Sequence, residues 1–317
     1  MTAAPLHSIL NPAGPQSLAI VRPWWLMFWT TTIVFVITLA LFFLSLVRGR
    51  RAGQPTSTAM LTSAVSGAVT LTVVILFGLL VASIWTGRAV ASTAPMNTAT
   101  AVTIEVTGHQ WWWEIAYDDP VAARRVTLAN EIHVPISRPI AIKVTSRDVI
   151  HSFWAPNIQQ KRDLIPGYTT AIWMQADRPG VFHGQCAEFC GKQHAHMAFD
   201  VVAESEADFG RWLNAQRDPA REPQTADEER GRDVFMTARC SGCHTIRGTS
   251  ASALAGPDLT HFASRLEIGA GARDNTEGHL SEWIANPHSV KPGNRMPANP
   301  FAPEDLRALT AYLASLR

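Results

Sequence analysis

Two long runs without any charged residue dominate the N-terminal third of the chain. The runs at 23–47 and 61–85 are each long enough to cross a hydrocarbon core of about 30 Å at 1.5 Å per residue. Tryptophans near the start of the first run stand where an aromatic belt lies. A buried core helix is the alternative, but such helices rarely exceed about 14 wholly apolar residues. The pattern predicts a transmembrane hairpin over 23–95, with helices over about 23–47 and 61–86, after an N-terminal segment, 1–22.

Arginines around these runs indicate their orientation. Arg48, Arg50 and Arg51 lie in the short connection between the runs. Arg22 and Arg88 stand alone outside them. Because cytoplasmic loops carry the excess of basic residues, we expect the connection in the cytoplasm and both termini on the extracytoplasmic side. The start of the chain shows no basic region, short apolar core and small-residue cleavage site of an ordinary signal peptide.

After the second run, the hydrophobic period changes from helical to two. Apolar and polar residues alternate over 102–107 and again over 140–144, and the segment 168–175 is rich in β-forming residues. Short strands broken by proline and glycine turns are typical of a β-sandwich or barrel. We therefore expect an all-β domain over 96–212, with a short helix at 204–215.

A proline-rich, charged stretch follows this domain. Residues 213–226 indicate a solvated linker, with an ordinary surface loop as the alternative. The remainder, 227–317, has helical signals at both ends, including Pro303 at a helix start. The last helix is expected to present one leucine face: Leu306, Leu309, Leu313 and Leu316. The predicted fold class is multidomain: a transmembrane hairpin, an all-β sandwich and an all-α domain.

Composition supports this organisation and narrows the partners. Charged residues make up 17% of the 317 residues, against about 25% in ordinary soluble proteins, which favours membrane segments over disorder. Residues 1–104 hold five basic and no acidic residues, whereas residues 105–317 hold 22 basic and 26 acidic ones. The resulting net charge of −4 argues against nucleic acid as a partner and favours a basic protein.

The first of two close cysteine pairs lies among soft metal ligands. In the segment CAEFCGKQHAHM, two thiolates, one imidazole and a thioether form a set suited to copper: Cys186, Cys190, His194 and Met197. The other histidine of the segment, His196, is expected to be a structural or surface residue. A second histidine must come from elsewhere, and His151, just after a predicted strand, is the candidate. Two cysteines allow a second copper to share the thiolates. The alternatives are a disulfide, a zinc site, which does not usually recruit methionine, and a plain surface histidine at 194.

The second cysteine pair, Cys240-Ser-Gly-Cys243-His244, is the C-x-x-C-H haem attachment motif. The thiols add across the haem vinyls and the imidazole binds iron, while a methionine on the other face raises the potential. Met296, in a loop braced by proline and glycine, is the candidate for that ligand, because Met236 is too close to the attachment site. A redox C-x-x-C motif would need a βαβ context that the pattern lacks, and a zinc site would need a second ligand pair.

Together with GHQWWWEIAY (108–117) and the hairpin, the first motif resembles subunit II of the haem–copper cytochrome c oxidases over about residues 12–212. The resemblance implies a cupredoxin domain, a Greek-key β-sandwich, with the binuclear copper centre CuA. It implies that one copper binds His151 and Met197, and that the other binds His194 and the backbone carbonyl of Glu188. It also implies that Cys186 and Cys190 bridge the two coppers.

The same resemblance implies roles for residues beside the copper ligands. Trp111 falls where the family has the tryptophan through which electrons reach CuA, and the two tryptophans after it are expected to pack within the domain. The carboxylate of Glu188 corresponds to a Mg²⁺ ligand at the contact with subunit I. Asp148 and Asp118 are candidates for docking a basic donor, or for ordinary loop charges.

Residues 227–317 resemble a class I cytochrome c, with Gly231 and Phe235 matching its first helix. Such a fusion is typical of bacterial oxidases that carry their own cytochrome c. It implies the electron-input subunit of a terminal oxidase in the bacterial inner membrane. Electrons arrive at haem c, pass to CuA and reach subunit I, where O₂ is reduced to water with proton translocation. The implied partners are subunit I, subunit III and a donor such as a cytochrome bc complex or a cytochrome c.

One departure from the family pattern concerns protons. Family members commonly place a glutamate near the start of the second transmembrane helix, whereas residues 1–104 contain no carboxylate.

The alternative function is the electron relay of a CuA-type nitric oxide reductase, which turnover on NO rather than O₂ would reveal. A membrane-anchored copper carrier would need exchangeable ligands and no haem, and quinol oxidase subunits lack the copper cysteines, so both are disfavoured.

Overall fold

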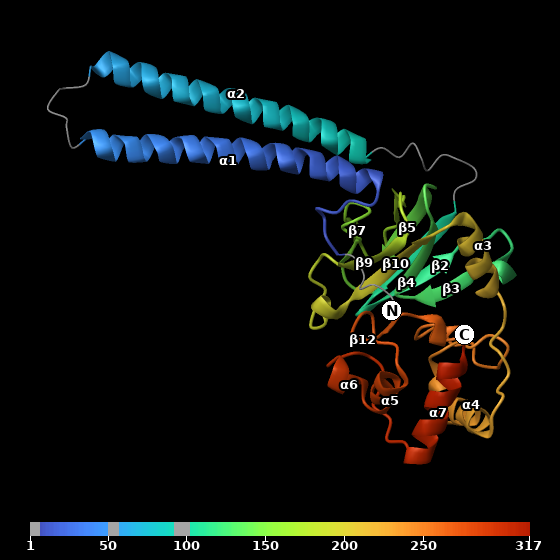
Figure 1. The fold of residues 1–317 in the computed structure, drawn as a ribbon. Helices are drawn as coiled ribbons and strands as arrows, with labels where there is room; N and C mark the ends of the chain where they lie inside the picture. Colours follow the sequence, from blue (N-terminus) through green and yellow to red (C-terminus); the bar gives the residue numbers. More distant parts are fainter. Residues whose placement is uncertain (1–6, 50–56, 92–101) are drawn as a thin grey trace. The chain divides into compact units, whose positions relative to one another are not determined.

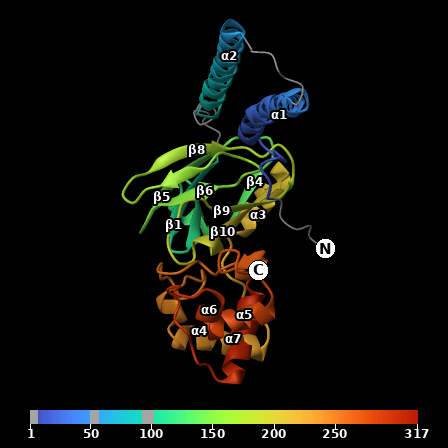
Figure 2. The same cartoon turned by 90° about the vertical axis from the view of Figure 1, so that its left-hand side faces the viewer.

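The computed structural model describes residues 7–49, 57–91 and 102–317, which fall into two compact units. One unit is a pair of long helices. The other contains the short N-terminal stretch 7–15 together with everything described from residue 102 onward. This second unit holds the sandwich and the C-terminal helical domain (Figures 1 and 2).

The helical unit consists of α1 (Pro15–Gly49) and α2 (Thr58–Ala91). Both helices are long and apolar enough to cross a membrane. In each helix, no residue of the most apolar stretch is buried. The two predicted spans are therefore present, but both helices extend beyond them, and α1 begins within the segment predicted to precede it. An uncharged run marks the apolar part of a helix, not its hydrogen-bonded ends. Arg50 and Arg51, on which the predicted orientation depends, lie outside the described residues.

Ten strands among the described residues form the sandwich. One sheet has the order β3-β2-β1-β5-β8: Val126–Ala129, Trp112–Tyr117, Thr103–His109, Ile140–Ser146 and Thr170–Met174. The other has the order β4-β10-β9-β6-β7: Glu131–Pro135, Ala198–Glu204, Gly180–Cys186, His151–Trp154 and Arg162–Leu164. Parallel pairing joins β1 to β5 and β10 to β4, and the remaining pairs are antiparallel.

The core of the sandwich follows from the two-residue period. In β1, Ile104 and Val106 are fully buried while their neighbours are half-exposed, and β1 pairs in register with Ile142 and Val144 of β5. Alternate side chains of a strand point to opposite faces, so one face of each sheet supplies the core. The alternation predicted from sequence is confirmed. The predicted short helix is also present as α3 (Glu206–Ala215), capped by Ser205.

The C-terminal domain is built on helices α4 (Ala226–Thr237), α5 (Glu277–Ala285), α6 (Pro287–Val290) and α7 (Pro303–Ser315), with a small ribbon of β11 (Glu267–Ile268) and β12 (Arg273–Asp274). Its core contains Phe235 from α4 and the predicted leucine face of the last helix, of which Leu309, Leu313 and Leu316 are buried. The all-α prediction for this domain is confirmed.

Candidate metal and haem sites

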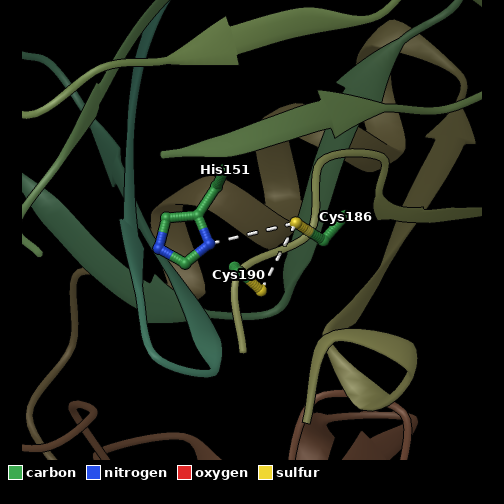
Figure 3. Close-up of side chains that lie close together, drawn as sticks. All are labelled: His151, Cys186 and Cys190. Atoms are coloured by element: carbon green, nitrogen blue, oxygen red, sulfur yellow. Dashed lines mark hydrogen bonds between the residues drawn. The ribbon is translucent and has the colours of Figure 1, made fainter. Parts of the chain in front are cut away.

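Strand pairing brings the first predicted ligands together. His151 is the first residue of β6 and Cys186 is the last of β9, and these strands pair with Phe153 opposite Cys186. The chain then turns through Cys190 and a short 3-10 helix, His194–His196, before Met197 leads into β10. Figure 3 shows the His151 ring and both cysteine sulfurs directed toward one another. Residues separated by 46 positions thus share one end of the sandwich.

The separations between donor atoms fit a metal centre. The two sulfurs lie 3.8 Å apart, far from the ~2.05 Å of a disulfide. Cys186 Sγ lies 3.9 Å from His151 Nδ1 and 3.2 Å from the carbonyl oxygen of Glu188. Cys190 Sγ lies 3.6 Å from His194 Nδ1 and 3.8 Å from Met197 Sδ. Donors bound to one tetrahedral metal through bonds of about 2.0–2.3 Å stand roughly 3.5 Å apart, so this set suits metals held between the sulfurs.

Protonation of the cysteine pair also favours a metal. The hydrogen bond between the two sulfurs lowers the pKa of the Cys186 thiol to about 3, although burial opposes that shift. The same hydrogen bond and burial raise the pKa of Cys190. The pair therefore gives up one proton readily and retains the other. A bound metal would supply the positive charge that the second thiolate needs.

The His151 ring is oriented by a carboxylate behind it. His151 Nε2 donates to Asp148 Oδ1 at 2.9 Å, which leaves Nδ1 facing the sulfur of Cys186. Asp148 Oδ2 in turn accepts from the backbone N–H of Gln110 at 2.7 Å. A carboxylate that fixes the tautomer of a metal-binding histidine is a common outer partner of metal sites. The sequence marks Asp148 as a docking charge or an ordinary loop charge, and no local pattern in it points to this contact with His151.

Two tryptophans hold the loop of candidate copper ligands, residues 186–197, which we call the copper loop. The indole Nε1 of Trp111 donates to the carbonyl oxygen of Cys190 at 3.0 Å, and Gln110 Nε2 donates to the same oxygen at 2.8 Å. Trp113 is fully buried, and its Nε1 donates to the carbonyl of Met197 at 3.3 Å. Trp111, in the turn between β1 and β2, thus touches the loop of the predicted ligands directly. The role of Gln110 was missed because an amide in a turn carries no pattern of its own.

The backbone and the side chain of Glu188 have different surroundings in this loop. Its carbonyl oxygen faces Cys186, while its side chain is exposed to solvent beside Phe189, which is itself 75% exposed. A backbone carbonyl and a side chain of one residue can therefore serve different partners. The structure leaves the carboxylate available to a group from outside the chain.

The second motif has the features of a haem site. Cys240 begins a 3-10 turn, Cys240–Gly242, and both cysteines are free thiols that are not fully buried. His244 Nδ1 donates to the carbonyl of Pro257 at 2.8 Å, so Nε2 is left for an axial bond. Burial lowers the pKa of His244 and keeps the ring neutral, as a ligand must be. A Cβ on Gly256 would lie 2.7 Å from the ring, so this cradle requires glycine.

Met296 lies in the loop that connects α6 to α7. Its backbone N–H donates to Asn294 Oδ1 at 2.8 Å, and Pro297 follows it directly. The side chain is half-buried. The loop that contains Met296 is therefore ordered by local hydrogen bonds, as a loop that presents an axial ligand would need to be.

Comparisons with known proteins agree with both motifs. The family described as the periplasmic domain of cytochrome c oxidase subunit II matches residues 119–205, and the cytochrome c family matches residues 228–317. The cytochrome c oxidase subunit 2 of Alkalihalophilus pseudofirmus is 35% identical over 97% of this chain and 90% of its own length. The chain belongs to the cytochrome c oxidase subunit II family.

Two further members of that family illustrate how far the similarity extends. Cytochrome c oxidase subunit 2 of Bacillus sp. strain PS3 is 32% identical over 68% of this chain and 62% of its own length. The crystal structure of the periplasmic domain of subunit II from Bradyrhizobium japonicum is 33% identical and covers 37% of this chain and 93% of that one, with a TM-score of 0.34. The Alkalihalophilus pseudofirmus subunit matches 97% of this chain, which includes both domains and the helices, in agreement with the fused architecture.

Proposed function

We propose that this chain is the electron-input subunit of a terminal respiratory oxidase. Electrons arrive at haem c, pass to CuA and continue to subunit I, where O₂ is reduced to water with proton translocation. The observation that carries the proposal is that one chain presents both donor sets. The loop of Met296 lies against Trp111, whose indole holds the carbonyl of Cys190.

Eleven residues carry the proposed cofactors and their connection. The six donors that would hold CuA are His151, Cys186, Glu188 (backbone carbonyl), Cys190, His194 and Met197. Haem c would be attached covalently to Cys240 and Cys243, and His244 and Met296 would bind its iron. Trp111 would connect the two sites. When bound, a copper pair held by both thiolates would supply fast one-electron transfer, because its bond lengths would change little on reduction.

The exposed residues of the copper loop, Glu188 and Phe189, suggest which surface meets partner subunits. The Glu188 carboxylate and the exposed ring of Phe189 lie beside the ligands, and we propose that they face subunit I, where the carboxylate would bind Mg²⁺. An exposed apolar ring next to an acidic group is typical of a protein contact. We also propose subunit III as a partner and a cytochrome bc complex or a cytochrome c as the donor. The site would stand on the periplasmic side of the bacterial inner membrane.

Purification of the intact complex tests the function. We expect two copper atoms and one haem c iron bound to this chain, the near-infrared absorption of a mixed-valence copper pair, and turnover on O₂ that depends on an added donor. Turnover on NO but not on O₂ would instead establish the nitric oxide reductase relay. Fewer than two coppers on the chain, or Cys186 and Cys190 recovered as cystine, would refute the copper assignment.

A further inference from the structure

Lys291 is a buried ammonium group at the boundary between the sandwich and the haem domain. It belongs to the haem domain, directly after α6, and is only 2% exposed. Its Nζ donates to the carbonyl oxygen of Trp111 at 2.7 Å and to that of Gly269 at 2.6 Å. Both acceptors are neutral carbonyls. Burial lowers the pKa of this lysine to about 7, so its position carries an electrostatic cost.

The two carbonyls come from different domains. Trp111 stands at the β1–β2 turn of the sandwich, and Gly269 stands in the ribbon of the haem domain. The residue after Gly269 continues the contact, because the backbone N–H of Ala198 donates to the carbonyl of Ala270 at 3.0 Å. Ala198 directly follows Met197. The Lys291 side chain thus binds the haem domain to the β1–β2 turn, and the main chain next to Gly269 binds it to the residue that follows Met197.

The loop after Lys291 rests on the same surface. Gln193, which is 5% exposed, donates from Nε2 to the carbonyl of Pro292 at 2.8 Å. The guanidinium of Arg295, next to Met296, lies 3.6 Å from Asp148, the carboxylate behind His151. This outer pair is largely exposed on the arginine side and contributes little by itself. The buried contacts of Lys291 and Gln193 are the stronger restraints.

We propose that Lys291 is a positioning residue that clamps the Met296 loop against Trp111 and so keeps haem c in an electron-transfer geometry with CuA. The inference rests on the proposed function. Electron tunnelling falls steeply with distance, so a docked loop gives one fast rate where a tethered but mobile domain gives gated transfer. A buried donor with one acceptor in each domain is suited to this role, because separation of the domains breaks its bond to the Trp111 carbonyl, while the bond to Gly269 holds the side chain in place within the haem domain.

The test compares Lys291→Met with wild type in the purified oxidase complex. Methionine keeps the length of the side chain and removes its donors. Hydrogen–deuterium exchange of peptides spanning 289–297 and 108–112 should rise in the variant. After flash reduction of haem c, transfer to CuA should slow by roughly tenfold, because the variant loses the free energy of one hydrogen bond of a buried charged group between the domains. The slower transfer should also depend on solvent viscosity. The haem c potential and the CuA absorption should stay unchanged.

Two further variants make the test specific. Gln193→Leu removes the other buried contact from the sandwich side and should move both readouts in the same direction. Lys161→Met, at an exposed site of the sandwich, should move neither. Equal exchange and equal transfer rates in wild type and Lys291→Met would overturn the clamp. Absence of transfer from haem c to CuA in wild type would instead refute the proposed function itself.

Discussion

At the scale of single residues, the copper loop is restrained through its main chain. The indoles of Trp111 and Trp113 bind the carbonyls of Cys190 and Met197, so two ligand positions are restrained through their backbone. A ligand whose backbone is already placed loses little freedom when a metal binds. Changes to a ligand side chain are therefore expected to alter the metal site while leaving the surrounding sandwich folded.

Met197→Leu tests that expectation. The thioether is replaced by a side chain of similar volume, so we expect a perturbed copper absorption and EPR spectrum with unchanged haem content and a change in stability of less than about 1.5 kcal/mol. Met236→Leu, in the haem domain, should leave the copper spectrum unaltered. Loss of haem absorption in Met197→Leu, with an intact copper spectrum, would contradict the assignment of the two motifs.

A second residue-scale feature is a charged cluster at His133. Its Nδ1 donates to Glu204 Oε1 at 2.8 Å and its Nε2 donates to Glu131 Oε1 at 3.0 Å. The ring also stacks on Trp212 with ring centroids 3.9 Å apart. Burial alone would lower the pKa of His133, but the two carboxylates outweigh it and the pKa is raised. Glu131 also accepts from the backbone N–H of Leu266 in the haem domain at 3.0 Å. The cluster therefore supports both the sandwich and the domain contact.

His133→Gln should make stability less dependent on pH. A histidine whose pKa is raised by folding stabilises the fold fully below its ordinary value of about 6.5, and this contribution is lost as the pH rises through the raised value. We expect the variant to lose about 1–3 kcal/mol near pH 6 and less near pH 9, measured by calorimetric unfolding of the complex. His288→Gln, at an exposed site, is the control. A loss that grows with pH would show that the imidazolium is not the stabilising form.

At the scale of elements, the haem domain depends on a close crossing of α4 and α7. A Cβ on Gly231 would lie 2.0 Å from the carbonyl oxygen of Ala308 and 2.6 Å from Cβ of Tyr312. Only glycine lets the two helices approach this closely. Phe235, one turn further along α4, then packs near the ring of Tyr312 with centroids 6.3 Å apart. The crossing brings the first and last helices of the domain together.

Gly231→Ala should destabilise the haem domain by about 1–3 kcal/mol, because the added methyl group forces the helices apart. Gly278→Ala is the matched control, since it also lies in a helix but has open space around its Cβ. There the substitution should be neutral or stabilise by up to about 1 kcal/mol. Denaturant unfolding followed by haem absorbance measures both. Equal effects at the two sites would exclude the crossing as the cause.

At the scale of the whole molecule, charge separates the membrane part from the rest. Residues 1–104 are purely basic in their charged side chains, whereas residues 105–317 carry a net −4. Opposite charge raises the association rate of a diffusing partner, and salt screens this effect over a Debye length of about 8–10 Å. An acidic electron-accepting part is matched to a basic donor.

The rate of reduction by a basic soluble cytochrome c should therefore fall as ionic strength rises. Stopped-flow reduction of haem c in the complex, between roughly 10 and 300 mM salt, measures the second-order rate. A small uncharged reductant serves as the control and should show no such dependence. A rate that rises with salt would mean that the docking surface itself is basic, despite the net charge.

Local patterns in the chain were sufficient for the element types and both ligand motifs. Apolar run length, two-residue alternation and cysteine spacing each reflect contacts between near neighbours, so a single sequence specifies them. His151 could be named because a copper set with one histidine is incomplete. The helix ends were less well predicted, since caps and flanking turns extend beyond the apolar run that marks a span.

Tertiary structure alone decided what lies between the motifs. Lys291 meets Trp111 across 180 positions, and Gln193 meets Pro292 across 99. A buried lysine in a loop has the same local pattern as a solvated one, and which of the two it is depends on surfaces contributed by another domain. The sequence by itself determined which elements form and which residues are the candidate copper-type and haem-type ligands. Only the packing of the domains decided that their loops share one interface, because such contacts depend on distance in space and not on spacing along the chain.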